Sequence, residues 1–235
     1  MREVLFYIAD HSPALTFAAK HLRKWGYAVA DSPSEAVTHV LLPVPTRGAA
    51  MPEGLGPDVT VFGGNLGPTN FRAVDLLKDE EYLARNAVIT AHCAIKVLLR
   101  RLERTLEGCP VLVIGWGRIS KALAPLLQAF GARVTIASRS VKERAMLSAL
   151  GYGVVGTGKL DADAYLVIFN TAPAAVMAQA AARDDAVLID LASMEGIAGD
   201  RVIRARGLPG KEAPESSGEL IACTAVRYAI GKETL

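Results

Sequence analysis

The sequence predicts an α/β protein built on parallel sheets, and three observations lead to this prediction. Short runs of apolar and β-branched residues alternate with segments that carry apolar residues at helical spacing, as in a parallel sheet covered by helices. A glycine-rich turn near the middle of the chain joins one such run to a helical segment. The length of 235 residues exceeds the usual size of one domain. We therefore expect a smaller N-terminal α/β domain and a second α/β domain, linked by a long helix.

Residues 1–85 are predicted to form the small N-terminal domain. Its strands are expected at residues 4–9, 27–30, 38–42 and 59–62, and its helices at residues 13–25 and 71–84. A loop rich in glycine and proline, residues 46–58, follows the third strand at the edge where open α/β sheets bind their ligands. Arg47 in this loop contacts an acidic substrate or is a solvated surface charge.

Residues 86–108 are predicted to form the connector helix. Alanine, isoleucine and leucine side chains keep one face of this segment apolar. Arginines cluster in its C-terminal half, where cations complement the helix dipole. A long helix that leads into the second domain is a natural link between the two domains.

Residues 110–140 carry a β–turn–α–β unit. In such a unit the first glycine, Gly115, makes the tight turn, and the second, Gly117, lets backbone N–H groups approach a pyrophosphate at a helix N-terminus. Ser120 stands where the fingerprint has its third glycine, and serine is small enough to keep the motif recognisable. The unit predicts a dinucleotide-binding Rossmann domain, a doubly wound parallel sheet, over residues 109–212.

The end of the second strand of this unit predicts the cofactor. Sites that prefer NAD place Asp or Glu about 20 residues after the glycines, where the carboxylate accepts a hydrogen bond from the ribose 2′-hydroxyl. This chain has Ser138, Arg139 and Ser140 there, followed by Lys142. Hydroxyls and a guanidinium suit a 2′-phosphate, because arginine binds phosphate through two parallel hydrogen bonds. The sequence therefore predicts NADP(H); the alternative is a glycine turn that binds no nucleotide.

The alternation of strands and helices continues after the glycine unit. Helices are expected at residues 140–150 and 174–182, and strands at residues 152–155, 165–169, 186–191 and 202–205. Residues 207–210, Gly-Leu-Pro-Gly, predict a rigid turn. The last segment, residues 213–235, is expected to form a C-terminal helix over residues 214–230, with Ser216 or Ser217 near its cap.

Small polar groups stand at the carboxyl ends of two later strands, the edge where such sheets bind ligands. For Asn170 and Asp190 a cofactor or substrate contact competes with a structural role in turns and caps. The expected cofactor-binding residues are Gly115, Trp116, Gly117, Arg118, Ile119, Ser138, Arg139, Ser140, Asn170, Thr171, Ala172, Asp190 and Ala192.

Composition and charge exclude several function classes. The chain carries 26 basic and 24 acidic side chains without a basic block, so nucleic acid is not an expected partner. Cys93, Cys109 and Cys223 lack the spacing of a disulfide framework or a zinc site, and no metal is expected. No signal-peptide pattern and no run of about 18 apolar residues is present. We expect a soluble, cytoplasmic protein that is not bound to a membrane.

Several motifs together resemble the A-subunit family of dipicolinate synthase. They are the Gly-Trp-Gly-Arg loop at 115–118, Ala-Ser-Arg-Ser at 137–140, Asn170-Thr171 with Pro173, Ile-Asp-Leu-Ala-Ser at 189–193, Gly-Leu-Pro-Gly at 207–210, Ala213-Pro214 and Gly218. The resemblance extends from about residue 38 and is strongest over residues 110–221. It implies two domains arranged as in formate dehydrogenase, with the cofactor in the cleft and a C-terminal helix that returns to the first domain.

The resemblance also implies an activity and a partner. The implied reaction is the NADP-linked interconversion of dihydrodipicolinate and dipicolinate in sporulation, with a flavoprotein-like second subunit. This chain departs from the family at residues 89–93, where it has Ile-Thr-Ala-His-Cys, and in a shortened segment between Ser193 and Gly207. These departures concern the identity of the substrate more than the fold.

The candidate catalytic residues are His92, Ser193 and Lys211. None of the four histidines follows the glycine loop, so the late histidine of ordinary 2-hydroxy acid dehydrogenases is missing. His92 could move a proton near neutral pH, or it is an ordinary surface or core histidine. Lys211, with Arg206, could hold a substrate carboxylate, or both are solvated loop cations.

Two functions remain open from the sequence. The first is an NADP-dependent oxidoreductase acting on dihydrodipicolinate or a similar dicarboxylic acid. The second is a noncatalytic dinucleotide-binding subunit that stabilises a complex with a flavoprotein-like partner. We also expect a homo-oligomer. Turnover of dihydrodipicolinate separates the two functions.

Overall fold

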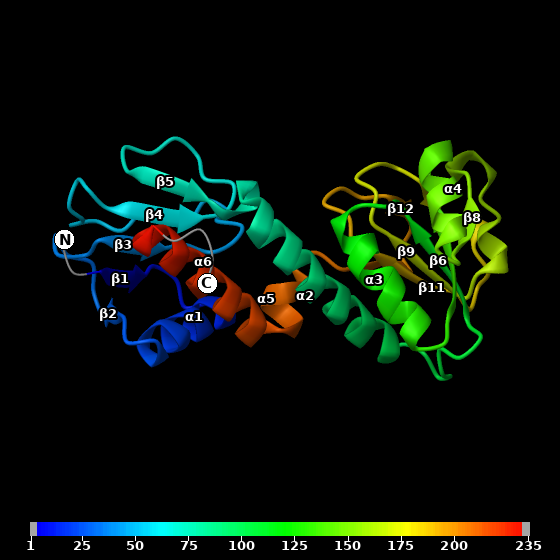
Figure 1. The fold of residues 1–235 in the computed structure, drawn as a ribbon, viewed down its shortest axis with the longest axis horizontal. Helices are drawn as coiled ribbons and strands as arrows, with labels where there is room; N and C mark the ends of the chain where they lie inside the picture. Colours follow the sequence, from blue (N-terminus) through cyan, green and yellow to red (C-terminus); the bar gives the residue numbers. More distant parts are fainter. Residues whose placement is uncertain (1–3, 232–235) are drawn as a thin grey trace. The chain divides into compact units, whose positions relative to one another are not determined.

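The computed structural model describes residues 4–231 and divides the chain into two compact units. One unit contains the chain up to Ile89 together with the segment from Pro209 onwards, and the other contains Thr90–Leu208. The boundary at Ile89 falls inside helix α2 (Glu80–Leu99), which therefore contributes residues to both units. Every strand pair in both units is parallel, so the predicted α/β class is confirmed (Figure 1).

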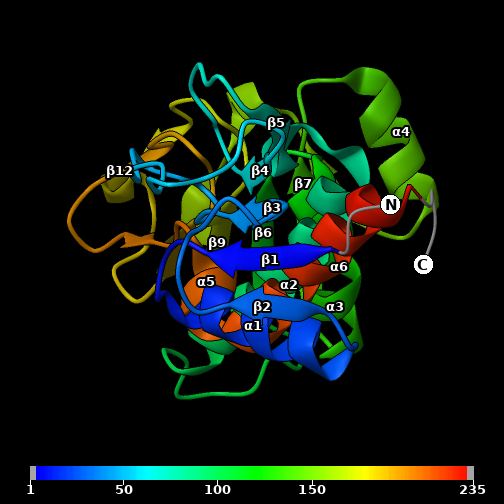
Figure 2. The same ribbon diagram turned by 90° about the vertical axis from the view of Figure 1, so that its left-hand side faces the viewer.

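The first unit is built on a five-stranded parallel sheet. Its strands lie in the order β2-β1-β3-β4-β5, seen from bottom to top in Figure 2. Their bounds are β1 Leu5–Ile8, β2 Ala28–Ala30, β3 His39–Leu41, β4 Thr60–Gly63 and β5 Arg72–Asp75. All four residues of β4 are buried, as expected for an inner strand of a parallel sheet.

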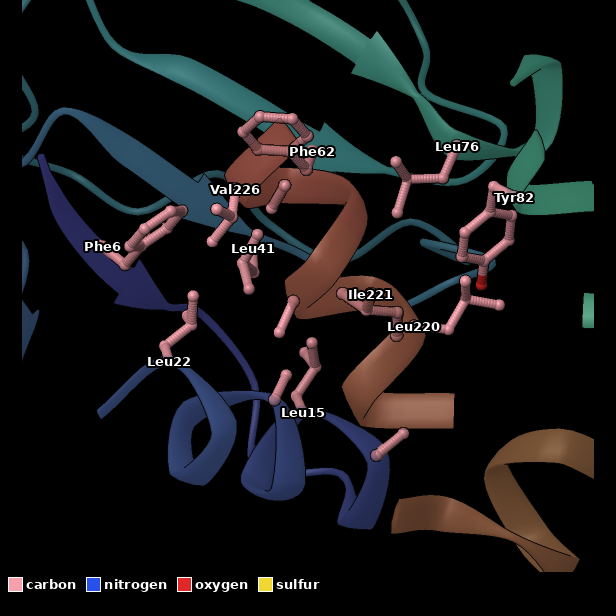
Figure 3. Close-up of a cluster of buried hydrophobic side chains, with 14 residues drawn as sticks. Phe6, Leu15, Leu22, Leu41, Phe62, Leu76, Tyr82, Leu220, Ile221 and Val226 are labelled. Atoms are coloured by element: carbon pink, nitrogen blue, oxygen red, sulfur yellow. The ribbon is translucent and has the colours of Figure 1, made fainter. Parts of the chain in front are cut away.

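Two helices, α1 (Pro13–Lys24) and α6 (Pro214–Ile230), cover one face of this sheet (Figure 1). The buried side chains that meet there come from the strands and from both helices, and include Phe6, Leu41, Phe62, Leu15, Leu22, Ile221 and Val226 (Figure 3). The C-terminal helix is thus part of the core of the first unit. Residues 232–235, the end of the predicted C-terminal segment, lie outside the described residues.

Helices α1 and α6 approach closely at Gly218. A Cβ atom at this position would lie 2.2 Å from the carbonyl oxygen of Ala14 and 2.7 Å from the backbone nitrogen of Ala18. Only a residue without a side chain allows this backbone contact. Gly218 was one of the residues that carried the family resemblance, and the structure gives its physical reason.

The opposite face of this sheet is covered by loop residues. Val40 and Val61 on this face pack against Met51 and Leu55, which come from the predicted loop 46–58. The loop therefore completes a second small core, and Arg47 within it is exposed.

The predicted helices at 71–84 and 86–108 are wrong in their bounds. Residues 72–75 form strand β5, Leu76–Lys78 form the short 3-10 helix η1, and one helix, α2, then runs without a break over Glu80–Leu99. The cause is local, because the Asp75 side chain accepts from the Leu77 N–H and the Asp79 side chain accepts from the Tyr82 N–H at 2.7 Å. These two aspartates set the starts of η1 and α2.

The second unit is built on a six-stranded parallel sheet in the order β13-β11-β9-β6-β7-β8. The strands are β6 Pro110–Ile114, β7 Arg133–Ala137, β8 Gly153–Val155, β9 Val167–Asn170, β11 Val187–Asp190 and β13 Ile203–Arg204. This is the Rossmann order, which reverses between β6 and β9. The carboxyl ends are in register there, since Ile114 pairs with Asn170 and with Ala137, and Asn170 pairs with Asp190.

Two helices, α3 (Arg118–Ala129) and α4 (Val141–Ala149), lie on one face of this sheet (Figure 1). The other face is covered by short 3-10 helices, η2 Thr157–Lys159, η3 Ala162–Ala164 and η4 Gln179–Ala181, and by a two-stranded sheet of β10 Met177–Ala178 and β12 Ile197–Ala198. The core under them includes Leu112, Ile168 and Leu188.

The predicted alanine-rich helix at 174–182 is wrong. This segment forms β10 and η4, because Val176 donates its N–H to the Gly196 carbonyl and the Gln179 side chain bonds both Asp200 and the Arg201 N–H. These partners lie about twenty residues later in the chain, and their bonds override the helix propensity of alanine.

Two further corrections concern the end of the chain. Residues Leu208–Glu212 form the short helix α5, where a rigid turn was predicted over 207–210. The cap of α6 is Ala213, so Ser216 and Ser217 lie inside that helix. Among the described helices none is both long and apolar enough to cross a bilayer.

Candidate functional site

The glycine loop after β6 turns at Gly115, whose backbone conformation favours glycine. Gly115 adopts φ +96°, and a Cβ atom there would lie 2.8 Å from the Thr171 hydroxyl oxygen. Its N–H donates to the Ala137 carbonyl at 2.9 Å, which ties the loop to the end of β7. The turn therefore depends on both neighbouring strands.

The second glycine leaves the N-terminus of α3 open. Gly117 is the N-cap of α3, with φ −90° and ψ −168°, and its cap makes no side-chain hydrogen bond. A Cβ atom built on it would meet nothing within 4 Å. The first N–H groups of α3 and the helix dipole form a site for an anionic group. The residues present thus fit the pyrophosphate of a dinucleotide.

Ser120 replaces the third glycine of the fingerprint with a hydrogen bond. Its side chain is fully buried, and its hydroxyl lies 2.6 Å from that of Thr171. Because Thr171 donates its single hydroxyl hydrogen to the Ile114 carbonyl at 2.9 Å, Ser120 is the donor in this pair. The bond joins α3 to the ends of β6 and β9.

The other residues of the glycine loop remain accessible. Trp116 is partly exposed, and its ring lies 5.8 Å from that of Tyr152 between centroids. Arg118 is exposed and Ile119 is half-buried in the first turn of α3. Trp116 is therefore a fluorescence reporter placed within the loop.

The end of β7 is organised by a carboxylate that the sequence argument did not include. Ser138 is buried and donates its hydroxyl to Glu143 Oε2 at 2.5 Å, while it accepts from the Ser140 N–H at 3.2 Å. Ser140 caps α4, because its hydroxyl accepts from the Glu143 N–H at 3.2 Å. The spacing of Ser140 and Glu143 is that of a capping box, which could have drawn attention to Glu143.

An arginine fixes the backbone at the same place. Arg144 donates from Nη1 to the carbonyls of Ser138 at 2.6 Å and of Arg139 at 2.9 Å. Arg139 itself is exposed. The strand end therefore offers two hydroxyls, an exposed guanidinium and one carboxylate.

Asn170 and Asp190 form a buried pair at the ends of β9 and β11. Both are almost fully inaccessible, at 0% and 2% exposure, and Asn170 Nδ2 donates to Asp190 Oδ1 at 2.9 Å. Asn170 Oδ1 accepts from the Ala172 N–H at 3.0 Å. The Asp190 carboxylate also accepts from the N–H groups of Ala192, Gly196 and Ile197, at 3.1, 2.7 and 3.2 Å.

This pair positions the two loops that follow the strands. Gly196 closes against it, since a Cβ atom there would lie 2.0 Å from Asn170 Nδ2. The side chains of Asn170 and Asp190 are thus engaged within the protein. Of the two roles that the sequence left open, these contacts favour the structural one. Cofactor contacts of Thr171, Ala172 and Ala192 stay a prediction, and their N–H groups already donate to Ile114, Asn170 and Asp190.

The three candidate catalytic residues are exposed and lie on three separate elements. His92 is on α2, Ser193 is in the loop after β11 that Asp190 holds, and Lys211 is on α5. His92 and Ser193 belong to the second unit and Lys211 to the first. Across residues 4–231 no group of three His, Cys, Asp or Glu side chains could hold a metal ion.

Comparisons with known proteins give relatives in sequence and in fold. The D-isomer specific 2-hydroxyacid dehydrogenase family, NAD binding domain, matches residues 96–181, which contain the glycine loop. The dipicolinate synthase A-subunit of Bacillus subtilis is 26% identical over 167 residues. That match covers 64% of this chain and 55% of the relative, so the chain spans about half the length of that protein.

Solved structures share the fold. The dipicolinate synthase A-subunit from Bacillus halodurans has a TM-score of 0.81 at 20% identity, covering 96% of this chain and 97% of that one. The corresponding protein from Bacillus subtilis has a TM-score of 0.79 at 17% identity, covering 98% and 97%. A transhydrogenase from Sinorhizobium meliloti has 0.71 at 12% identity, covering 96% and 93%. The resemblance in sequence and fold that the motifs indicated is confirmed, and the fold is that of nicotinamide-dinucleotide-binding dehydrogenases.

Proposed function

Because the chain resembles the dipicolinate synthase A-subunit in sequence and in fold, we propose that it is an NADP(H)-dependent oxidoreductase acting on dihydrodipicolinate or a similar dicarboxylic acid. The observation that carries the proposal is the open N-terminus of α3 behind Gly117, at the point where the strand order reverses. The Gly115 turn and the Ser120–Thr171 hydrogen bond fix the backbone at this point.

When bound, the cofactor would supply the redox chemistry by taking up the hydride of the dihydropyridine ring, whose aromatisation also releases a proton. The N–H groups that open α3 would hold the pyrophosphate. Arg139 and Lys142 would attract the 2′-phosphate, and Ser138 and Ser140 carry hydroxyls at the same strand end.

Exposed polar side chains are the candidates for contact with the substrate. Within the second unit we assign Arg206 to a substrate carboxylate and His92 to the proton released on aromatisation, both by their charge and exposure. Lys211, on α5 of the first unit, stays a separate candidate for a carboxylate. Ser193 lies in a loop whose backbone donates hydrogen bonds to Asp190 from Ala192 and Gly196, on either side of it.

Turnover tests this proposal. Incubation of the chain with dihydrodipicolinate and NADP⁺ should raise absorbance at the nicotinamide band in proportion to the dipicolinate formed, alone or with a flavoprotein-like second subunit. Titration of NADPH and NADH against Trp116 fluorescence should show tighter binding of NADPH. Replacing Arg139 by Asp should shift this preference towards NADH by about 1–3 kcal/mol, the strength of a charge-assisted hydrogen bond.

One observation favours the noncatalytic alternative. The candidate catalytic side chains are solvent-exposed and lie on separate elements, whereas the cofactor loop is tightly built. Under this alternative the chain binds the dinucleotide and stabilises a complex with a flavoprotein-like partner. Dinucleotide binding without turnover, both alone and with the second subunit, would favour it; binding of neither dinucleotide would contradict both functions.

A further inference from the structure

The Ser138 hydroxyl, which a 2′-phosphate would need as a hydrogen-bond donor, already donates to the carboxylate of Glu143. Ser138 is 4% exposed, and its single hydroxyl hydrogen is donated to Glu143 Oε2 at 2.5 Å. The oxygen of the same hydroxyl accepts from the Ser140 N–H. Ser138 therefore has no second hydrogen to offer to an incoming anion while Glu143 stays in place.

The position of Glu143 is fixed through its backbone. Its N–H donates to the Ser140 hydroxyl in the cap of α4, so the residue starts the helix directly beside the end of β7. Arg144 holds the carbonyls of Ser138 and Arg139, which keeps the strand end rigid. Rotation of the exposed Glu143 side chain would move the carboxylate away from Ser138 without a change in these backbone contacts.

We propose that Glu143 weakens the preference of this site for NADP(H), an inference that rests on the proposed function. Its carboxylate competes with a 2′-phosphate for the Ser138 hydroxyl and repels the phosphate as a like charge. A ribose 2′-hydroxyl instead can donate to a carboxylate at this edge of the sheet, as in sites that prefer NAD. Glu143 thus disfavours NADP(H) selectively.

Opposing charges then determine the net preference. Arg139 and Lys142 attract the phosphate, while Glu143 opposes it from the first turn of α4. The preference of the native chain for NADPH is consequently smaller than the two cations alone would give. Removing the charge of Glu143 should therefore increase the preference for NADPH.

The test is the variant E143Q with NADPH and NADH titrated in parallel against Trp116 fluorescence. We expect the affinity for NADPH to rise about tenfold, the effect of one charge-assisted contact, while that for NADH stays within about twofold or falls. E103Q is the matched control, because Glu103 is an exposed carboxylate of the same unit that precedes β6 and so lies towards the opposite end of that strand. An unchanged ratio of the two affinities in E143Q overturns the inference.

A second pair of variants tests the competition for the hydroxyl. In an S138A background the contested group is gone. E143A removes both the charge and the acceptor, whereas the glutamine of E143Q can still accept from Ser138 through Oε1, so the gain from E143A should be clearly smaller in S138A than in the native background. An equal gain in both backgrounds contradicts this competition. E143A also replaces E143Q in the first test if that variant does not fold, with the same expected direction.

These outcomes separate the inference from the function on which it rests. Binding of both dinucleotides by the native chain with no change of ratio in E143Q removes the role of Glu143 and leaves the proposed function standing. Failure of the native chain to bind either dinucleotide would contradict both the role of Glu143 and the proposed function.

Discussion

The hydroxyl of Ser120 in α3 donates to the hydroxyl of Thr171 after β9, 2.6 Å away, and Thr171 donates in turn to the Ile114 carbonyl. This short chain of bonds crosses the point where the strand order reverses. It gives the second unit a hydrogen bond between helix and strand end, where the usual fingerprint has a glycine that lets the helix pack closely on the strand.

We expect S120A to lower the free energy of unfolding by about 1 kcal/mol, the net worth of one hydrogen bond. T171V should cost more than S120A, because it also removes the hydrogen bond to the Ile114 carbonyl. The double variant should cost less than the sum, because both substitutions remove the Ser120–Thr171 bond. Urea unfolding measures all three. S148A is the control, since Ser148 is an exposed serine on α4, and additive costs in the double variant would contradict the shared bond.

Close packing of α1 on α6 depends on Gly218. The Cβ atom of G218A would lie 2.2 Å from the Ala14 carbonyl oxygen, so α6 must shift and the unfolding free energy should fall by about 1–3 kcal/mol. G210A is the matched control in the same unit. A Cβ atom at Gly210 meets nothing within 4 Å, and alanine favours the helix there, so its stability should stay equal or rise. Equal effects of the two substitutions in thermal unfolding would refute this account.

Arg227 of α6 is paired with Asp79 and Glu81 at the start of α2. Burial opposes ionisation of Asp79, but hydrogen bonds from the Tyr82 N–H, the Tyr228 hydroxyl and Arg227 outweigh it and hold the pKa of this carboxyl below its usual range. R227M leaves a nearly buried carboxylate unpaired, so it should cost about 1–3 kcal/mol.

The Asp79 carboxyl also predicts acid sensitivity. Because its folded pKa is lowered, its contribution is present above the unfolded pKa, near 3.9, and is lost as pH falls through the folded value. D79N should therefore be less stable than the native chain at neutral pH, with the difference narrowing below about pH 4. A difference that stays constant down to pH 2 would count against this assignment.

His39 predicts a second pH effect at higher pH. Its ring lies between Phe6 and Phe62, with centroids 5.2 and 6.0 Å away, and its Nδ1 is 2.8 Å from the Thr38 hydroxyl oxygen. Thr38 donates its hydroxyl hydrogen to the Leu5 carbonyl, so Nδ1 of the neutral ring carries the hydrogen.

Burial lowers the pKa of His39, and the charge of Arg72 lowers it further. Stability is therefore full above the unfolded pKa, near 6.5, and falls as pH drops from there through the folded pKa. H39F keeps an aromatic ring between the two phenylalanines and should remove this slope between about pH 7 and pH 5. Urea midpoints across this range measure it, with H21F as a control at the partly exposed His21; an equal loss of slope in both would refute the assignment.

Much of the fold follows from local sequence signals. The strand and glycine pattern of 110–137 and the helix at 214–230 were predicted from apolar runs and glycine or proline boundaries, and the structure has them. The segments that were predicted wrongly depend on partners distant in sequence. Nothing local tells that Gln179 will bond Asp200, or that Val176 will bond the Gly196 carbonyl and prevent a helix.

The candidate site shows the same division. Gly115 and Gly117 were selected from their spacing, and at Gly115 the structure gives the reason, because the turn at φ +96° requires glycine. The partner of Ser120, by contrast, lies 51 residues away, and the Asn170–Asp190 pair joins two strands 20 residues apart. Glu143 was within reach through its capping-box spacing, but its contact with Ser138 depends on how β7 meets α4.

The two glycines of the loop allow folding and binding to be measured separately. G115A places a Cβ atom 2.8 Å from the Thr171 hydroxyl at φ +96°, so it should lose both stability and dinucleotide binding. G117A places its methyl group in open space at φ −90° but puts alanine at the N-cap of α3, so stability should fall by no more than about 1 kcal/mol. The same methyl group fills the approach to the N–H groups of α3, so NADPH affinity should fall about tenfold or more by Trp116 fluorescence. Unchanged affinity in a stable G117A would mean that the helix N-terminus is not the pyrophosphate site, and the cofactor would then have to be sought elsewhere on the protein.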